Sequence, residues 1–486
     1  MKRDFLQIEA GRVLTANGSA SAGPCVISLS GTQIASVKAA CVGAAASGLL
    51  AMPAMSNAHD HGRGLRPLSY GAFDQPLETW FTALNVHPPV DPYLNAALAF
   101  SRMARSGIGL VVHCHMARSA ATLIEDAVAV CRAAQDVGIR LAFVVPMRDR
   151  GRLGYFPDEV VLSRLSVECR RAVESRWLGG ILPVGEQIAL VEEIARRCES
   201  DLVSVLYGPA APHWCTNHLL EQVAEASALN GRRIHMHCLE TGFQREFADA
   251  AFDEGLFPYL QRIGLLTDRL TLAHGVCLRS EEMDMIAEAG CVVSLNTCSN
   301  LRLHSGIAPA REMAARGVPL AIGIDALGLD DTEDGLRELR LTRLLHGGVG
   351  FEPGLSGEYL FTCATTNGAR AVTGRPGKAG LAAGGAADIA LVDFDGMSRD
   401  VLPGTTPDLE ILLARGQAQY ISSLWVNGEE VVRQGALVNI DFEAIESELI
   451  SQARHSADDY LAALPTLQAL QSALKSCYRD GLHKSG

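Results

Sequence analysis

Short apolar runs alternate with amphipathic helical patterns through the middle of the chain. Seven of these runs have the length and the branched side chains of buried strands, and an eighth precedes His59. The seven runs are Gly109–His115, Arg140–Val145, Leu202–Tyr207, Arg233–His237, Leu270–His274, Cys291–Leu295 and Pro319–Asp325. Strands that alternate with helices form parallel sheets, because each crossover helix packs back on the sheet. Eight such units predict an α/β fold, a (β/α)8 TIM barrel.

Both ends of the chain have a different pattern, with short strand-like runs separated by glycine-containing turns. We expect residues 1–52 and 378–441 to form the two parts of one small β-sandwich, and residues 53–377 to form the barrel. Residues 442–486 carry leucine and alanine at helical spacing. They predict a C-terminal helical segment that packs outside the barrel.

Composition narrows the class of partner. The 486 residues carry a formal net charge of −13, which argues against nucleic acid and favours a neutral or cationic small molecule. The apolar stretch 37–55 contains Lys38 and several glycines or prolines, so we expect buried strand and loop and no membrane span. Thirteen cysteines without a Cys-x-x-Cys pair, and no signal peptide after Met1, predict a cytoplasmic protein without a thiolate zinc site.

Residues that can bind a metal end four of the predicted strands. His59 and His61 are two positions apart, which places both imidazoles on one face of a strand. His237, His274 and Asp325 end three later strands, where barrel active sites are built. Taken singly, these three residues are explained by packing, a rim hydrogen bond and a helix cap. Together, imidazoles and one carboxylate predict a single zinc or iron ion with an open position for water.

Four further side chains are weaker candidates for substrate contacts. His113 and His115 face one way at the end of the second strand, and substrate contact or hydrogen bonds to neighbouring loops explain them equally well. Arg63 can hold an anionic or carbonyl group or form a salt bridge within its loop. Trp80 lies in a helical run, where packing is the better explanation, although the loop before it could close over a ring.

Motifs along nearly the whole chain carry a resemblance to a known superfamily. They are Asn57–His61, Pro76–Trp80, His237–Thr241, Ala273–Gly275, Cys298–Leu303, Gly323–Asp325 and Ala364–Ala369. With these motifs the chain resembles the amidohydrolase superfamily, and within it the chlorohydrolase and aminohydrolase branch that includes guanine, 8-oxoguanine and methylthioadenosine deaminases. The resemblance also implies a homodimer.

The resemblance assigns roles to the candidate residues. It implies that His59, His61, His237 and Asp325 bind one metal ion, with His274 either a further ligand or the residue that orients the attacking water. Glu240 matches the proton-shuttling glutamate of the family, the alternative being a hydrogen-bond partner of a ligand histidine. The strand Leu202–Tyr207 ends without the lysine that bridges two metals in some relatives, which favours one ion, zinc before iron.

The motif at the end of the fourth strand differs from the one that is common in this branch. Relatives often have Pro-His-x-Pro there, whereas this chain has Pro209-Ala210-Ala211-Pro212-His213, so His213 is displaced by three positions and its contact with substrate is open. We expect hydrolytic deamination of an amino-substituted nitrogen heterocycle. The alternative is hydrolysis of a urea, carbamate or amide, or a dechlorination-type displacement. Ala210 favours this alternative, because it stands where the histidine of the branch would be. A non-catalytic scaffold is the remote alternative, because scaffolds in this superfamily usually lack metal ligands that this chain retains.

Overall fold

A barrel of eight parallel strands forms the centre of the computed structural model, which describes residues 6–15, 18, 20–116, 119–378 and 380–484. The strands follow chain order around the barrel, and a bridge between Asp60 and Asp325 joins the first strand to the segment after the last. They are β7 (Met55–Asp60), β8 (Ile108–Cys114), β9 (Arg140–Met147), β10 (Val203–Pro209), β11 (Ile234–Cys238), β12 (Leu270–His274), β13 (Val292–Leu295) and β14 (Leu320–Ile322). The predicted α/β barrel is confirmed.

Helices surround this barrel and bury one apolar face each. In α4, Ala127, Val130, Cys131 and Ala134 recur at helical spacing and are buried, while the opposite face is exposed. The outer helices include α3 (Pro92–Arg105), α4 (Leu123–Val137), α7 (Val184–Cys198), α8 (Asn217–Asn230), α9 (Gly242–Ala251), α11 (Ser280–Ala289), α13 (Ala310–Ala315), α14 (Gly335–His346) and α16 (Gly368–Thr373). Packing against these helices holds the strand ends in fixed positions.

The two ends of the chain meet in one sheet. Strand β6 (Leu49–Pro53) pairs antiparallel with β17 (Ile389–Asp393), far away in sequence. The same sheet contains β2 (Arg12–Thr15), β3 (Ala20–Ala22), β18 (Ile421–Val426), β19 (Glu429–Arg433) and β20 (Ala436–Leu437). A second, three-stranded sheet consists of β1 (Leu6–Ala10), β4 (Cys25–Ser30) and β5 (Gln33–Ala39), and side chains of both sheets share a small apolar core.

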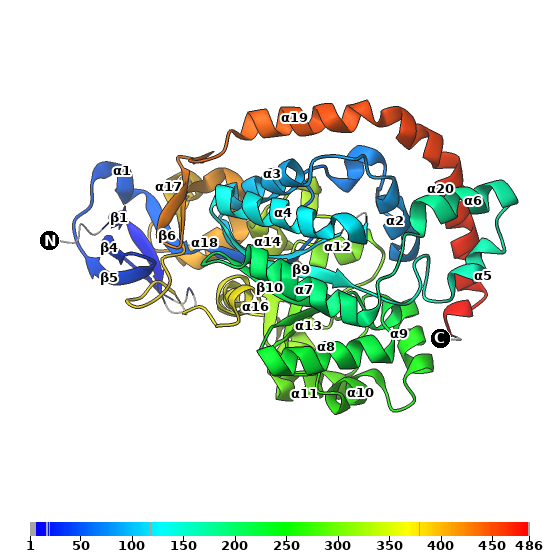
Figure 1. Cartoon of the computed structure of the whole chain (residues 1–486). Coiled ribbons are helices and arrows are strands. Elements are labelled where there is room, and N and C mark those ends of the chain that lie inside the picture. Colours follow the sequence, from blue (N-terminus) through cyan, green and yellow to red (C-terminus); the bar gives the residue numbers. More distant parts are fainter. Residues whose placement is uncertain (1–5, 16–17, 19, 117–118, 379, 485–486) are drawn as a thin grey trace.

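The predicted boundaries at residues 52, 377 and 441 stay predictions. The parts of the predicted segments at residues 1–5, 379 and 485–486 lie outside the described residues. The predicted C-terminal helical segment corresponds to two helices, α19 (Phe442–His455) and α20 (Ala457–Arg479). Figure 1 shows α19 running along the outside of the molecule from the sheets near the N-terminus, and α20 lying at the opposite end beside α2 (Leu77–Ala83), α5 (Asp158–Leu162) and α6 (Val167–Trp177).

The last barrel strand is shorter than the sequence pattern predicts. The predicted strand extends to Asp325, whereas β14 ends at Ile322. Asp325 has φ +63°, a left-handed conformation that a strand cannot continue through. Its backbone N–H instead donates to the His59 carbonyl oxygen at 2.9 Å, which ties this loop to the first strand.

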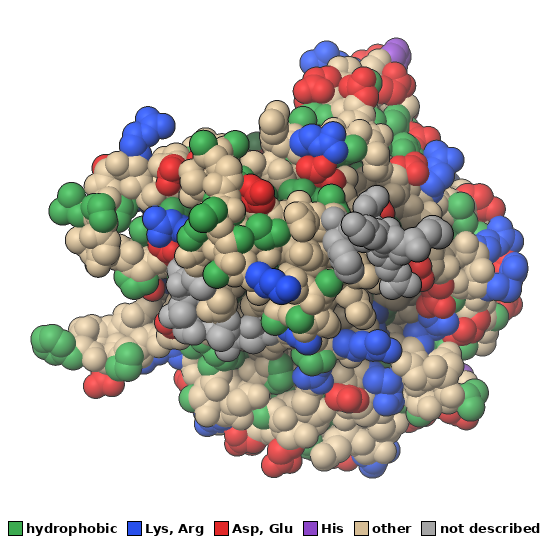
Figure 2. Space-filling model, turned by 90° about the vertical axis from the view of Figure 1, so that its left-hand side faces the viewer, with side chains coloured by type: hydrophobic (Ala, Val, Ile, Leu, Met, Phe, Trp, Pro, Cys, Tyr) green, Lys and Arg blue, Asp and Glu red, His purple; other side chains and the backbone are tan. Residues whose placement is uncertain are grey.

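The surface gives two general observations. Among the described helices, none is both long and apolar enough to cross a bilayer. On the face drawn in Figure 2, acidic and basic side chains are interspersed, and hydrophobic side chains lie on the protruding segments and in small groups between the charges. No stripe of basic side chains runs across the described part of this face, which agrees with the acidic net charge.

Candidate metal centre

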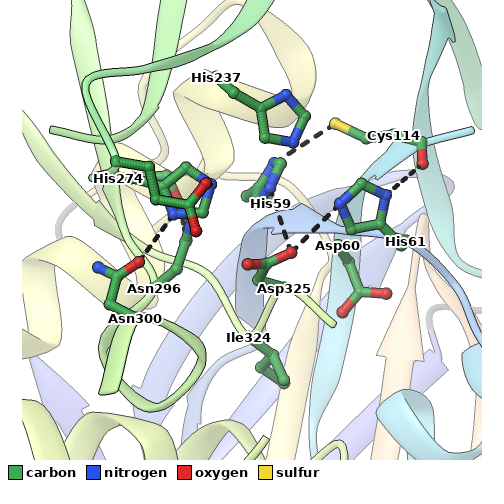
Figure 3. A network of polar contacts seen from close by, with 12 residues as sticks. His59, Asp60, His61, Cys114, His237, His274, Asn296, Asn300, Ile324 and Asp325 are labelled. Carbon is green, nitrogen blue, oxygen red and sulfur yellow. Dashed lines mark hydrogen bonds and ion pairs between the residues drawn. The ribbon is translucent and has the colours of Figure 1, made fainter. Parts of the chain in front are cut away.

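The ends of β7, β11 and β14 bring three histidines and an aspartate together. Oδ1 of Asp325 lies 3.4 Å from Nε2 of His59 and 3.2 Å from Nε2 of His61. Ligand atoms of His59, His61 and His237 lie within 4.8 Å of one another, as do those of His59, His274 and Asp325. Figure 3 shows these side chains converging from separate strand ends. Five residues that were predicted from the sequence as metal-site candidates therefore occupy one cluster.

Backbone carbonyl groups fix the orientation of two of the imidazoles. Nδ1 of His61 donates to the Cys114 carbonyl oxygen at 2.8 Å, and Nδ1 of His237 donates to the Ala210 carbonyl oxygen at 2.9 Å. Because a carbonyl oxygen only accepts, Nδ1 carries the hydrogen in both rings and Nε2 keeps its lone pair. Both lone pairs are thus available to a cation in the cluster.

Two buried side chains contact His59 at Nδ1, the ring nitrogen that is not near Asp325. Its Nδ1 shares a hydrogen bond of 2.8 Å with Nε2 of His235 and contacts the Cys114 sulfur at 3.3 Å. Its Nε2 is buried without a hydrogen-bond partner. His59, Cys114 and His235 also lie close enough to form a second group of ligand-type residues. However, 2.8 Å is short for two ligands of one metal and suits a hydrogen bond, so His235 supports His59.

His274 ends β12 and is oriented by two asparagines. Its Nδ1 lies 2.8 Å from Oδ1 of Asn300 and 3.2 Å from Nδ2 of Asn296. The shorter contact makes Nδ1–H the donor to Asn300, which leaves Nε2 as the lone-pair nitrogen. This Nε2 is buried without a hydrogen-bond partner and lies 3.6 Å from Oε2 of Glu240. Burial lowers the pKa of His274 to about 4, so the ring is neutral at physiological pH.

Glu240 lies two residues beyond the end of β11 and is only 3% exposed. Ser305 Oγ donates to its Oε1 at 3.3 Å. Burial raises the pKa of Glu240 well above its ordinary value, and the negative charges of Asp325 and Glu78 raise it further. The raised pKa favours the protonated form of this carboxyl group, which is the form that can donate a proton.

Asp325 has the opposite protonation behaviour. Burial by itself raises its pKa, but the close contact with His59, followed by that with His61, lowers the pKa well below its ordinary value. The site therefore contains two buried carboxyl groups with opposite pKa shifts. Such a pair is typical of an active site that needs one acid and one base at the same pH.

The arrangement fits one divalent cation. Metal–nitrogen distances of about 2.0–2.1 Å in tetrahedral geometry place neighbouring ligand atoms about 3.3 Å apart. The separations of 3.2 and 3.4 Å between Asp325 Oδ1 and the two histidine nitrogens match this value. The unpartnered, buried Nε2 atoms of His59 and His274 are also explained by a cation, since buried polar atoms otherwise have partners.

Three non-glycine residues at or just beyond these strand ends have left-handed backbone conformations. Leu239, His274 and Asp325 have φ values of 49°, 78° and 63°, although none is a glycine. Each such residue costs about 1–3 kcal/mol and persists only where the surrounding structure enforces it. The strain aims the His274 and Asp325 side chains into the cluster where a regular strand would alternate them away.

His113, His115 and Arg63 lie beside the cluster, outside its ligand groups. Nε2 of His113 lies 3.3 Å from Nδ1 of His115, and His113 is buried with its Nδ1 packed against the backbone of Gly62. His115 is partly exposed, with its Nε2 3.9 Å from an Asp126 carboxylate oxygen. Arg63 points an Nη2 group at the Met116 sulfur, 2.8 Å away. Substrate contacts by these three residues stay predictions.

His213 and Trp80 are both buried. The ring of His213 lies 4.0 Å from the Tyr155 ring centroid and 4.5 Å from that of Trp214. Trp80 donates its Nε1 hydrogen to the Ala72 carbonyl oxygen at 3.1 Å. Aromatic packing accounts for both side chains, and a direct substrate contact by either stays a prediction.

Several supporting residues were missed by the sequence analysis. His235 and His237 repeat the i and i+2 spacing of His59 and His61, and this spacing could have identified His235. Asn300 lies in the Cys298–Leu303 motif, which was noticed without a role. Glu78 likewise lies in the Pro76–Trp80 motif, to which no role was assigned, and no local pattern marks Tyr155.

Comparison with known proteins supplies independent information. A family model described as the amidohydrolase family matches residues 50–431. A 5-methylthioadenosine/S-adenosylhomocysteine deaminase of Pyrococcus furiosus is 30% identical over 415 residues, which cover 82% of this chain and 87% of that protein. A 5′-deoxyadenosine deaminase of Methanopyrus kandleri is 30% identical over 314 residues, covering 63% of this chain and 70% of its own.

Solved structures of two further proteins share the fold. Atrazine chlorohydrolase from Arthrobacter aurescens TC1, complexed with zinc, superposes with a TM-score of 0.76 at 22% identity, covering 92% of this chain and 99% of its own. An adenosine deaminase from Xanthomonas campestris with bound zinc gives 0.74 at 22% identity, covering 94% and 98%. At these identities the similarity establishes the overall architecture of the fold.

Proposed function

The chain belongs to the amidohydrolase family, and we propose that it is a metal-dependent hydrolase that deaminates an amino-substituted nitrogen heterocycle. One observation carries this proposal. The buried Glu240, whose pKa is raised well above its ordinary value, lies 3.6 Å from His274 and beside a cluster of imidazoles and Asp325, whose pKa is held low. A hydrolase that displaces an amine needs such an acid, because the departing nitrogen must be protonated.

The proposed metal ligands are His59, His61, His237 and Asp325, with His274 a further ligand or the group that orients water. Zinc is the proposed ion, since three imidazoles and one carboxylate suit it and two proteins of the same fold were solved with zinc. When bound, the ion lowers the pKa of water toward about 7 and thereby makes a nucleophile available at neutral pH.

The chain's own residues then divide the proton transfers. Asp325, whose pKa is held low, accepts a proton from the attacking water. His274, fixed by Asn300 and with Nε2 free, orients that water toward the ring carbon. Glu240 first protonates a ring nitrogen, which makes the attacked carbon more electrophilic. The Glu240 carboxylate then takes up the second proton of the attacking water and passes it to the departing amine, and the proton held by Asp325 restores Glu240 at the end of the cycle.

The relatives suggest which heterocycles to test first. Several similar proteins are deaminases of 5-methylthioadenosine, S-adenosylhomocysteine or 5′-deoxyadenosine. Aminopurines and their nucleosides are therefore the first class of candidate substrates. We further propose that the protein acts as a homodimer in the cytoplasm.

A second reaction is favoured by Ala210 and by one neighbour. Ala210 stands where relatives often have a histidine that contacts the tetrahedral intermediate, and His213 is buried among aromatic rings. One protein of the same fold is a chlorohydrolase. Hydrolysis of a urea, carbamate or amide, or displacement of chloride from a ring, would use the same water-activating residues with a different leaving group.

A substrate panel tests both reactions. Zinc-loaded protein is incubated with aminopurines and their nucleosides, aminopyrimidines, pterins and triazines, and separately with ureas, carbamates and amides. Ammonia release, with the product mass expected for replacement of an amino group by a hydroxyl group, supports deamination. Cleavage confined to the second group or chloride release supports the alternative. No turnover by zinc-loaded protein across both groups would contradict the proposed function, and Glu240→Gln serves as the inactive control.

A further inference from the structure

The C-terminal helix α20 reaches the region behind Glu240. The match to the family model ends at residue 431, so α20 lies beyond the part of the chain that the family model describes. Figure 1 shows α20 at the end of the molecule opposite to the N-terminal sheets, alongside α5 and α6. Its last turn carries Tyr478, which is 5% exposed although it lies near the end of the chain. A polar side chain buried at this place requires an explanation.

Tyr478 is attached to the segment that contains Tyr155. The Tyr478 hydroxyl oxygen accepts a hydrogen bond from the Tyr155 backbone N–H at 3.2 Å, and the two rings meet edge to face at 5.4 Å. Beyond the helix, His483 bonds the Glu246 carboxylate at 2.6 Å and Lys484 lies 3.2 Å from it. Glu246 is part of α9, so the C-terminal segment is fastened to α9 as well as to Tyr155.

Hydrogen bonds connect Tyr155 in turn to residues around Glu240. Its hydroxyl group donates to Oε1 of Glu78 at 3.2 Å and accepts from Nε2 of Gln244 at 3.3 Å. Oε1 of Gln244 in turn accepts from the Glu240 backbone N–H at 2.8 Å. A single side chain, Gln244, therefore connects the Tyr155 hydroxyl directly to the backbone of Glu240.

A second hydrogen-bond path connects Tyr155 through Glu78 to Thr241, the residue that follows Glu240. Thr241 Oγ1 donates to the same Glu78 oxygen at 2.6 Å. Glu78, Tyr155, Thr241, Gln244 and Glu240 are all at most 5% exposed. Solvent does not compete for these hydrogen bonds, and in such surroundings the loss of one partner leaves a buried polar group unsatisfied. Leu239, with φ +49°, adds strain that the network must hold in place.

We propose that Tyr478 is a positioning residue for Glu240, which it holds through Tyr155 and Gln244. The inference rests on the proposed function, because it gives Glu240 the role of proton donor. By this inference α20 completes the active site from outside the region that the family model describes. The simpler alternative is that α20 only adds apolar packing and stability, and the two differ in what a single hydroxyl group should do.

Tyr478→Phe removes that hydroxyl group and keeps the ring. Tyr460→Phe is the matched control, since Tyr460 lies on the same helix outside the network. We expect Tyr478→Phe to lower kcat by about ten- to a hundred-fold, because a small misplacement of a reacting group costs this much. KM and bound metal should stay within twofold of the wild-type values. Tyr155→Phe should lower kcat similarly, and the double variant should lose little more than either single variant.

Hydrogen exchange of the peptide containing Glu240 and Gln244 gives a readout without turnover. Tyr478→Phe should speed exchange in this peptide, whereas Tyr460→Phe should not. Unchanged exchange, unchanged kcat, a kcat loss matched by metal loss, or additive effects of the two tyrosine variants would each overturn the inference. If the wild-type protein hydrolyses no substrate in the panel, only the proposed function fails, because the exchange comparison still decides whether Tyr478 holds the Glu240 segment.

Discussion

His59 and His235 share a hydrogen bond of 2.8 Å between Nδ1 and Nε2, and their rings are nearly parallel, with an interplanar angle of 9°. The two residues come from β7 and β11, so the bond also joins the first and fifth strands of the barrel across its interior. Burial lowers the pKa of His235 well below its ordinary value, which keeps its ring neutral and able to accept a hydrogen from His59. When His59 Nδ1 carries the shared hydrogen, the lone pair of the His59 ring is on Nε2, the atom that faces Asp325.

Removal of this support should weaken metal binding. We expect His235→Ala to lower zinc affinity about 10–100-fold, the usual cost of losing the hydrogen-bond partner of a ligand histidine. Zinc titration against a competing chelator measures the effect. His218→Ala is the matched control, because His218 is exposed on α8. Equal zinc affinities of the two variants would show that His235 does not support the site.

Glu240→Gln should separate chemistry from metal binding. The amide keeps the size of the side chain but cannot transfer a proton, so we expect normal zinc content and a loss of about 10²–10⁴-fold in kcat. Asp325→Asn should impair both, because Asp325 contacts two of the proposed ligand histidines and has the low pKa of a base. Metal analysis of the purified variants and steady-state kinetics on the same samples give the comparison. Near-normal turnover of zinc-loaded Glu240→Gln would rule out its role as the proton donor.

Most residues of the metal-site cluster could be predicted from the sequence, whereas few of the residues that support them could. His59, His61, His237, His274 and Asp325 could be predicted because parallel strands present their carboxyl ends at one face of a barrel, so order along the chain implies proximity. The support of each ring depends on tertiary contacts with no sequence period. The network behind Glu240 joins positions 78, 155, 244 and 478, and no local pattern relates them. The early end of β14 was also missed, because the left-handed turn at Asp325 is set by its bond to β7.

Asn300 should act through the orientation of His274. Asn300→Ala leaves the His274 Nδ1–H without its acceptor, so the ring is free to turn or to change tautomer. We expect kcat to fall about tenfold, the equivalent of one lost hydrogen bond of about 1.4 kcal/mol. Asn300→Asp keeps an acceptor oxygen and should retain more activity than the alanine variant, which kinetics on zinc-loaded samples can measure. Equal losses in both variants would mean that hydrogen-bond acceptance by residue 300 is not what matters.

His213 should make the fold sensitive to acid. Burial, followed by the positive charge of Arg150, lowers the pKa of His213 to about 3, whereas an unfolded histidine has a pKa of about 6.5. The folded state resists protonation of this ring. The contribution of the neutral His213 ring to the free energy of unfolding is therefore fully present above pH 6.5. That contribution is lost progressively as the pH falls toward 3, because only the unfolded chain binds the proton. At pH 4 the expected cost is about 3 kcal/mol.

His213→Phe tests this linkage, since phenylalanine keeps an aromatic ring against Tyr155 and Trp214 and cannot be protonated. Urea unfolding of both proteins at pH 7.5 and pH 4, with chelator present throughout to remove metal effects, gives the four free energies of unfolding. The wild-type protein should lose about 3 kcal/mol more than the variant between the two pH values. Any strain from the larger ring lowers the stability of the variant equally at both pH values and cancels in this difference. A pH dependence identical in the two proteins would mean that His213 is protonated with an ordinary pKa and is therefore solvated, as a residue lining a substrate pocket would be.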